Sequence, residues 1–359
     1  MFSFAAVGVL LSATVALSAP ATPPPTPQGG VGLEQAPSYH ITSDFDFASV
    51  NLALNQEYIE LDLFHHILAE FPVEQFEAEG LTAEDRFLIE YMADQEAGHA
   101  ILLSNMLGAN AAKQCNYSYP FDSVRSSIDF CQKLTRFGES GVYGFLEHLE
   151  NRASAEMLLQ SITTEARQQM VFRQFEGLFP MPVFFETGIT QSMAWTLLSQ
   201  YITHCPEENP RIQWQNFPGL SVANDPTQAA LQLEVTPAIT HNLSTPLTTP
   251  GQQVDLTWED PGKSVGPDGL YTTTTTAGAA KYAAWISQLN ITYTPLSNIT
   301  ENFASTYQPF AQVFGPGTAP VVNDTMFILV TDDNPYVTPA NLSLLNPHVV
   351  AGPALYQSG

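Results

Sequence analysis

Four long stretches of helical periodicity, each with a glutamate inside its apolar stripe, constrain the fold of this chain most strongly. Apolar residues recur at helical spacing over residues 43–71, 82–107, 122–149 and 151–175. Thr82 is a good N-cap, Pro72 ends the first stretch, and Gly108 follows the second. We therefore expect four helices of roughly 25 residues, each about 37 Å long.

The connections between these stretches predict how the helices are arranged. Short loops join the first helix to the second and the third to the fourth, so each of these pairs should be antiparallel. The loop between the second and third helices has about 14 residues and could extend about 46 Å, enough to cross the whole bundle. A long crossover between two antiparallel pairs is typical of a ferritin-like bundle. A shorter fifth helix is expected over residues 189–204.

The sequence changes character after residue 205, where Thr, Val, Pro, Gly and Asn dominate. Residues 254–258 alternate strictly between apolar and polar, as a half-buried strand does. Further strands are expected at residues 231–235, 282–286, 291–294 and 327–331. The predicted class is α+β multidomain, with a ferritin-like four-helix bundle followed by an all-β, sandwich-like domain. The expected organisation is a signal peptide at 1–18, a Pro-rich tail at 19–40, the bundle at 41–205 and the β domain at 206–359.

Acidic residues on the four helices lie at the same expected depth. Glu57 lies about 13 residues before the end of its helix and Glu96 about 13 after the start of the next, so both lie about 20 Å from their shared turn. Glu96 and His99 share one helix face at i and i+3. Carboxylate di-iron bundles use one Glu from each of two helices and a Glu-x-x-His from each of the others. The predicted metal ligands are Glu57, Glu96, His99, Glu139, Glu165 and Gln168.

Gln168 stands where that pattern requires a second histidine. A neutral amide oxygen is a weaker ligand for iron than an imidazole nitrogen. The sequence therefore predicts a degenerate site for iron or manganese, which holds one ion well and the second poorly, or none. In the metal-free alternative, the carboxylates share protons and form hydrogen bonds with Arg167, Gln168 or Tyr58.

The N-terminus and the cysteines predict an exported protein. An apolar run of roughly 14 residues is too short to span a bilayer and fits a signal peptide cleaved after Ser18. In an oxidising compartment two of Cys115, Cys131 and Cys205 should pair, and the spacing does not decide which. A secreted or cell-wall glycoprotein is expected, because Asn-x-Ser/Thr sequons occur at Asn116, Asn242, Asn290, Asn298, Asn323 and Asn341.

The charge balance excludes two classes of partner. The chain has 36 acidic and 11 basic residues, for a formal net charge of -25. Such a charge repels phosphate backbones and anionic lipid surfaces. We expect no nucleic-acid partner, and no later segment is apolar enough to span a membrane.

Several motifs resemble the ferritin-like domain of fungal secreted stress-response and sexual-development proteins. They lie at residues 52–60, 94–99, 138–144 and 164–167, and the likeness continues through residues 177–182, 204–210 and 349–354. Plant desiccation-related ferritin-like proteins are similar. The resemblance implies an exported protein linked to nutrient stress, desiccation or development. Many relatives carry Glu-Ala-Arg-His where this chain has Gln168, which disfavours ferroxidase chemistry here.

Three functions follow from these observations. The first is a secreted stress- or development-associated protein with a degenerate metal site and no iron-storage role. The second is a di-metal carboxylate oxidase using iron or manganese. The third is an extracellular protein that binds cell wall or matrix through the β domain, with Trp258, Trp285 and Tyr271 as candidate contacts or, alternatively, as core residues.

Overall fold

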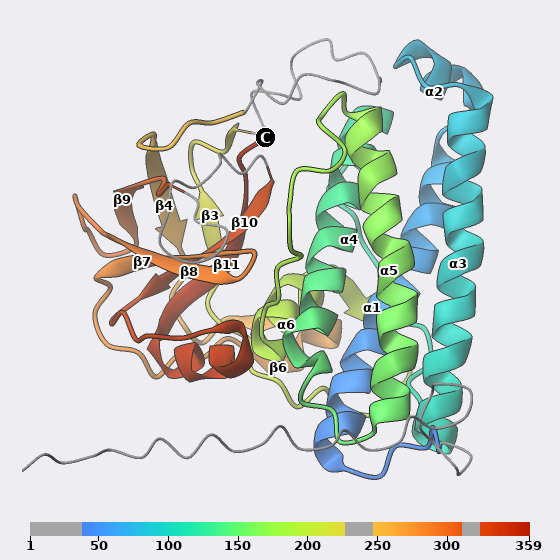
Figure 1. Ribbon diagram of the computed structural model, residues 1–359, viewed down its shortest axis with the longest axis horizontal. Coiled ribbons are helices and arrows are strands. Elements are labelled where there is room, and N and C mark those ends of the chain that lie inside the picture. Colours follow the sequence, from blue (N-terminus) through green and yellow to red (C-terminus); the bar gives the residue numbers. More distant parts are fainter. Residues whose placement is uncertain (1–37, 227–246, 311–323) are drawn as a thin grey trace, which may run out of the picture. The chain divides into compact units, whose positions relative to one another are not determined.

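The computed structural model describes residues 38–226, 247–310 and 324–359. The long helices lie before residue 200, and most of the strands follow them (Figure 1). The expected signal peptide at 1–18, nearly all of the Pro-rich tail and the strand expected at 231–235 lie outside the described residues. The same holds for the sequons at Asn242 and Asn323.

The four expected helices are present as α1 (Asp44–Glu70), α3 (Ala83–Leu107), α4 (Val124–Leu146) and α5 (Arg152–Phe175). Side chains cap each start, and Thr82 forms a capping box with Asp85. α4 differs from expectation at both ends. Ser123 rather than Asp122 is its N-cap, and residues 147–148 form a turn instead of continuing the helix to residue 149. A short helix, α2 (Val73–Ala78), was not predicted in the α1–α3 connection.

Residues 108–123 cross the bundle from one end to the other, as predicted. At the near end the Ile41 amide donates to the Met106 carbonyl at 3.4 Å, and at the far end Arg125 pairs with Glu79 at 3.1 Å. The segment contains η1 (Gly108–Asn110) and β1 (Asn116–Tyr117). Short connections on either side of a full-length crossover give the ferritin-like order of helices.

The fifth helix is shorter than the sequence predicted. α6 covers Gln191–Ser199, because the Thr190 hydroxyl accepts from the Met193 amide and caps its start. Residues 202–204, expected to be helical, form strand β2 (Ile202–His204), which pairs with β1. A disulfide joins Cys115 to Cys205 beside this pair, and Cys131 is the free, buried cysteine. The expected arrangement of one pair and one free cysteine is confirmed.

Two antiparallel sheets form the β region, in the strand orders β11-β10-β7-β8 and β3-β4-β9, and β5 pairs with β6. The strands predicted near residues 254, 282, 291 and 327 are present, whereas β3, β5, β6, β9 and β11 were not predicted. The bounds are β3 (Leu220–Val222), β4 (Gln253–Trp258), β5 (Ser264–Val265), β6 (Tyr271–Thr272), β7 (Tyr282–Ser287), β8 (Asn290–Pro295), β9 (Phe303–Tyr307), β10 (Thr325–Thr331) and β11 (Val349–Gln357). The 3-10 helices η2 (Pro267–Gly269) and η3 (Pro339–His348) complete the region.

The inner faces of the two larger sheets share one apolar core. Leu256 of β4 packs in the same cluster as Trp285 of β7 and Ile328 of β10. This is the packing of a sandwich. Trp285 and Tyr271 are buried, so their rings stabilise cores rather than offering aromatic contacts to a glycan.

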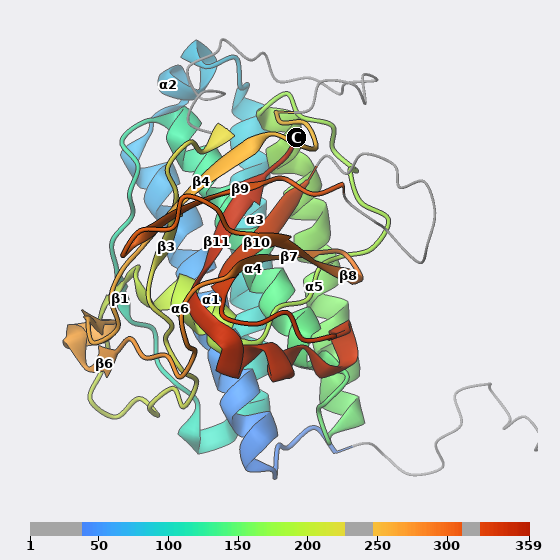
Figure 2. The ribbon, with the colours of Figure 1, turned by 90° about the vertical axis from the view of Figure 1, so that its left-hand side faces the viewer.

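α6 connects the bundle to the sheets. It contacts α1 and α4 on one side and β11 on the other (Figures 1 and 2). One apolar cluster includes Leu52 of α1, Trp195 of α6 and Phe327 of β10. Residues 39–359 accordingly form one contact unit, and the expected boundary after residue 205 stays a prediction.

Substitution of Gly144 by alanine should strongly reduce the stability of the fold. A Cβ atom there would lie 1.6 Å from the carbonyl oxygen of Ile189, whose amide is held by Ser140 at 2.9 Å. We expect Gly144→Ala to lower the free energy of unfolding by about 3 kcal/mol, measured by denaturant titration. Gly98→Ala on α3 is the matched control, because a Cβ there meets nothing within 4 Å and alanine favours the helix. Equal effects of the two substitutions would contradict the assigned close approach.

Candidate metal centre

Four side chains from three helices converge inside the bundle. Glu57 comes from α1, Glu96 and His99 from α3, and Glu165 from α5, and their ligand atoms all lie within 4.8 Å of one another. The three carboxylates are at most 2% exposed, and the imidazole is 11% exposed. The i, i+3 spacing of Glu96 and His99 places both on the inner face of α3.

The His99 ring is the centre of this group. Nδ1 lies 3.1 Å from Glu57 Oε2, 3.0 Å from Glu96 Oε2 and 3.8 Å from Glu165 Oε1. Nε2 lies 3.0 Å from the hydroxyl of Thr164, which donates to the Ser161 carbonyl and is therefore left to accept from the ring. Thr164 fixes the orientation of the ring, a role that no sequence pattern indicated.

The charges of this group depend on one another. Burial by itself lowers the pKa of His99, but the Glu57 and Glu96 carboxylates more than reverse this and raise it to about 11. Burial raises the pKa of Glu57 to about 7 against the opposing effect of His99. Burial also raises the pKa of Glu165 well above its usual value, and neighbouring carboxylates add to the rise. Without a metal ion, the group therefore retains protons near neutral pH.

Two further buried glutamates flank the group. Glu60, one turn after Glu57, is fully buried, and its pKa is raised by burial and then by Glu96 and Glu57. Its Oε1 accepts from Gln56 at 2.7 Å, and its Oε2 has no partner among the described residues. Glu60 was not among the predicted ligands.

Glu139 lies outside the four-residue group, although it was predicted as a ligand. The Arg136 guanidinium lies 3.7 Å from its Oε2, and within the described chain neither carboxylate oxygen accepts a hydrogen bond. Burial raises the pKa of Glu139, and Arg136 works against the rise. Arg136 thus supplies a fixed positive charge where a second metal ion would be expected to neutralise Glu139.

Gln168, the other unusual predicted ligand, is buried beside Glu96. Its Nε2 donates to Glu96 Oε1 and, at 3.3 Å, to Gln95. Its Oε1 is buried without a hydrogen bond from any described residue. Gln168 therefore holds Glu96 Oε1 with one end and leaves one weak donor atom available at the other.

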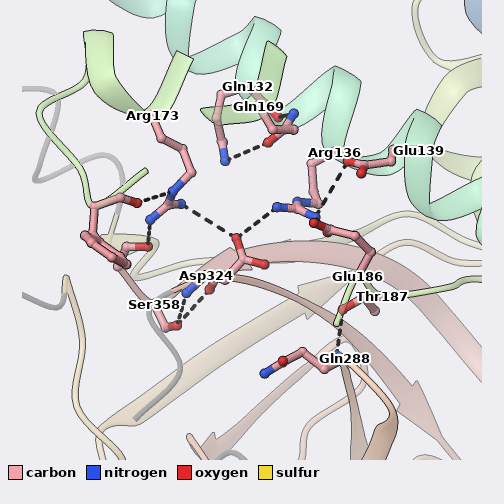
Figure 3. Close-up of polar contacts among 12 residues, drawn as sticks. Gln132, Arg136, Glu139, Gln169, Arg173, Glu186, Thr187, Gln288, Asp324 and Ser358 are labelled. Carbon is pink, nitrogen blue, oxygen red and sulfur yellow. Dashed lines mark hydrogen bonds and ion pairs between the residues drawn. The ribbon is translucent and has the colours of Figure 1, made fainter. Parts of the chain in front are cut away.

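A network of buried ions links this region to the β sheet (Figure 3). Arg136 pairs with Glu186 and lies 3.3 Å from Asp324, the residue before β10. Arg173 of α5 lies 3.6 Å from the same Asp324 and donates to two backbone carbonyls. Both arginines are at most 2% exposed. The only sequence signal for this network is the i, i+3 spacing of Arg136 and Glu139.

The four-residue group fits one divalent transition-metal ion. Three carboxylates and one imidazole are a donor set that suits iron or manganese. Oxygens of Glu60, Glu139 and Gln168 also lack a hydrogen bond within the described residues, but these side chains add no imidazole, and Glu139 lies against Arg136. The residues present therefore fit a single-ion site better than a paired one.

Comparison with known proteins matches the helical region to a family model and most of the chain to a relative. Residues 45–178 match the family model described as a ferritin-like domain, which spans α1 to α5 and every predicted ligand. Protein rds1 of Schizosaccharomyces pombe is 50% identical over 346 residues, covering 93% of this chain and 86% of the relative. The chain belongs to the rds1 family. The family runs through both the helical and the β regions, because the match extends far beyond the ferritin-like domain.

These matches confirm the ferritin-like domain and the fungal relative that the motifs predicted. The likeness to plant desiccation-related proteins stays a prediction. Across the described parts of the chain, no helix is both long and apolar enough to cross a membrane.

Proposed function

We propose that this rds1-family protein is an exported stress- or development-associated protein that binds one iron or manganese ion through Glu57, Glu96, His99 and Glu165, and does not store iron. The convergence of these four side chains within 4.8 Å carries the proposal. A link to stress or development rests on the resemblance of its motifs to that group of proteins.

The roles of the residues follow from their surroundings. His99 loses its proton to present Nδ1, while Thr164 holds the opposite nitrogen and so fixes the ring. Gln168 donates to Glu96 and keeps one carboxylate oxygen from turning away. Bound iron or manganese supplies a redox centre shielded from bulk water, because the carboxylates around it are buried.

Export is supported by two features of the structure, a disulfide and accessible sequons. The disulfide between Cys115 and Cys205 is stable in an oxidising compartment. The sequons at Asn116 and Asn298 are exposed, and those at Asn290 and Asn341 are partly exposed, so their side chains are accessible for glycosylation. Both features agree with the apolar N-terminal run.

A di-metal oxidase is the second candidate. The unpaired buried oxygens of Glu60 and Glu139 favour it, because they are carboxylate donors next to the four-residue group. The pairing of Arg136 with Glu139 opposes it. The number of ions per chain distinguishes the two candidates.

Metal analysis of secreted protein purified without chelators tests the proposal. We expect about one iron or manganese ion per chain, and at least a tenfold lower content in Glu96→Ala, since loss of even an outer-shell partner of a ligand weakens metal affinity about 10–100-fold. Glu90→Gln, an exposed position on the same helix, should retain the ion. Two ions per chain would favour the oxidase, and none after reconstitution with either metal would reject both candidates.

A further inference from the structure

Strand β8 forms an open edge of the β region. It is the last strand in the order β11-β10-β7-β8, so among the described residues no strand pairs with its outer side (Figure 2). An edge strand presents a row of backbone N–H and C=O groups that can pair with a strand of another chain. Every residue of β8 before Pro295 is partly exposed, so solvent reaches the strand along its length.

The other edges of the two larger sheets carry features that limit such pairing. The register of β11 on β10 shifts twice, and β11 contains Pro353. β3 has only three residues, and Ser297 forms an isolated bridge with Ser305 on the outer side of β9. Bulges, prolines, short strands and covering segments are the usual protection of an edge. β8, in contrast, pairs with β7 in one regular register along its whole length.

The sequence of β8 favours pairing with a second copy of itself. Residues 282–300 contain no charged side chain, and residues 291–294, Ile-Thr-Tyr-Thr, are of types with high β propensity. In an antiparallel two-fold pairing centred on Thr292, Ile291 of one copy lies opposite Tyr293 of the other. The net charge of -25 repels two copies at long range, but salt at about 0.15 M screens charges separated by more than about 8 Å. The edge is therefore self-complementary and carries no charge of its own against the contact.

Two of the sequons lie at the ends of this strand. Asn290 is the first residue of β8, and Asn298 follows the strand by three residues and is exposed. Nδ2 of Asn290 donates to the Thr292 hydroxyl at 3.0 Å, and a glycan on this nitrogen still leaves one hydrogen for that bond. A strand of six residues is about 20 Å long. Because N-linked glycans are bulky and strongly hydrated, two of them at opposite ends would flank most of this edge.

We propose that the outer edge of β8 pairs with β8 of a second copy of this chain, and that glycans on Asn290 and Asn298 prevent this pairing in the exported protein. The glycans take the place of the charges, prolines or bulges that protect other edges. The proposal rests on the export that the proposed function includes, and it does not require a metal ion.

Sedimentation velocity of the secreted protein, in about 0.15 M salt, tests the proposal. We expect the native protein to be a monomer. Asn290→Gln/Asn298→Gln should dimerise at least about tenfold more tightly, with a Kd of about 10 μM, because two paired strands bury only a small interface. Asn116→Gln removes an exposed sequon outside β8 and should stay monomeric. Mass spectrometry of glycopeptides establishes which sequons are occupied.

A lysine in β8 tests whether the dimer uses this edge. When Thr292→Lys is added to the double variant, the two copies meet with like charges at the centre of the pairing, so the dimer should be lost. Thr272→Lys is exposed and outside β8, so it adds the same charge and should leave the dimer intact. Hydrogen exchange of the β8 amides should slow as the concentration of the double variant rises.

Thermal midpoints establish that each variant is folded, and hydrogen exchange of the double variant carries the test if Thr292→Lys does not fold. A monomeric double variant would overturn the proposal, as would a dimer that persists with Thr292→Lys or equal dimerisation of the native glycoprotein. Glycans at other sequons, with none at Asn290 and Asn298, would also overturn it and leave export supported. A secreted, glycosylated monomer that takes up no metal would overturn only the metal proposal, so the two failures are distinguishable.

Discussion

Asp324→Asn should lower the free energy of unfolding by about 3 kcal/mol or more, because it leaves two buried guanidinium groups without their shared carboxylate. Asp324 lies 3.3 Å from Arg136 and 3.6 Å from Arg173 and is itself almost fully buried. Burial lowers the pKa of Arg173, and Asp324 works against that effect. The charge on Asp324 therefore keeps Arg173 ionised as well as paired.

Urea titration monitored by far-UV circular dichroism measures this loss. Asp333→Asn is the control, because Asp333 is exposed and close in sequence, and it should change stability by less than about 0.5 kcal/mol. Replacing Arg136 alone by methionine should also destabilise, since Glu139, Glu186 and Asp324 lose their shared cation. A loss below about 1 kcal/mol for Asp324→Asn would show that the network does not connect the sheet to the helices energetically.

Without metal, the protein should become less stable as the pH rises from 5 to 8. Glu57 has its pKa raised from 4.5 to about 7, so its contribution is complete below pH 4.5 and is lost as the pH passes 7. His99 has its pKa raised from 6.5 to about 11, so its contribution is complete below pH 6.5 and is lost progressively between pH 6.5 and 11. Glu57 alone accounts for a fall on the order of 3 kcal/mol.

Thermal melts of chelator-treated protein across this range measure the effect. Glu57→Gln should flatten the curve, because it removes the group that titrates near pH 7. Added manganese should stabilise more at pH 8 than at pH 5, since metal binding requires deprotonated carboxylates and a neutral imidazole. A thermal midpoint of the metal-free protein that rises from pH 5 to pH 8 would contradict the burial of Glu57.

Much of the helical region could be predicted because its signals are local. Thr82, Pro72 and Gly108 mark helix ends through caps and backbone preferences of neighbouring residues, and α1 and α3 end as expected. The prediction that the fifth helix continues to residue 204 was wrong, because the structure of these residues depends on a distant partner. Residues 202–204 pair with β1, a partner more than 80 residues away in the sequence, and this pairing overrides local periodicity.

Some residues of the candidate site could be predicted from local spacing, and others could not. Glu57, Glu96, His99 and Glu165 could be found by counting residues along helices, because rise per residue and i, i+3 spacing fix depth and face. Glu139 satisfied the same count but lies against Arg136, and Glu60 is buried beside the group without having been chosen. Depth along a helix does not fix which neighbouring charge a buried carboxylate meets.

By itself the sequence determined the α+β class, the crossover bundle and the four side chains that converge inside it, because these depend on periodicity, loop length and spacing within a helix. Only the tertiary structure decided which cysteines pair and that Asp324 joins two arginines of the bundle. The Arg136–Asp324 contact spans 188 residues of sequence. No local preference encodes such a distance, because it is fixed by the packing of the β region on the helices.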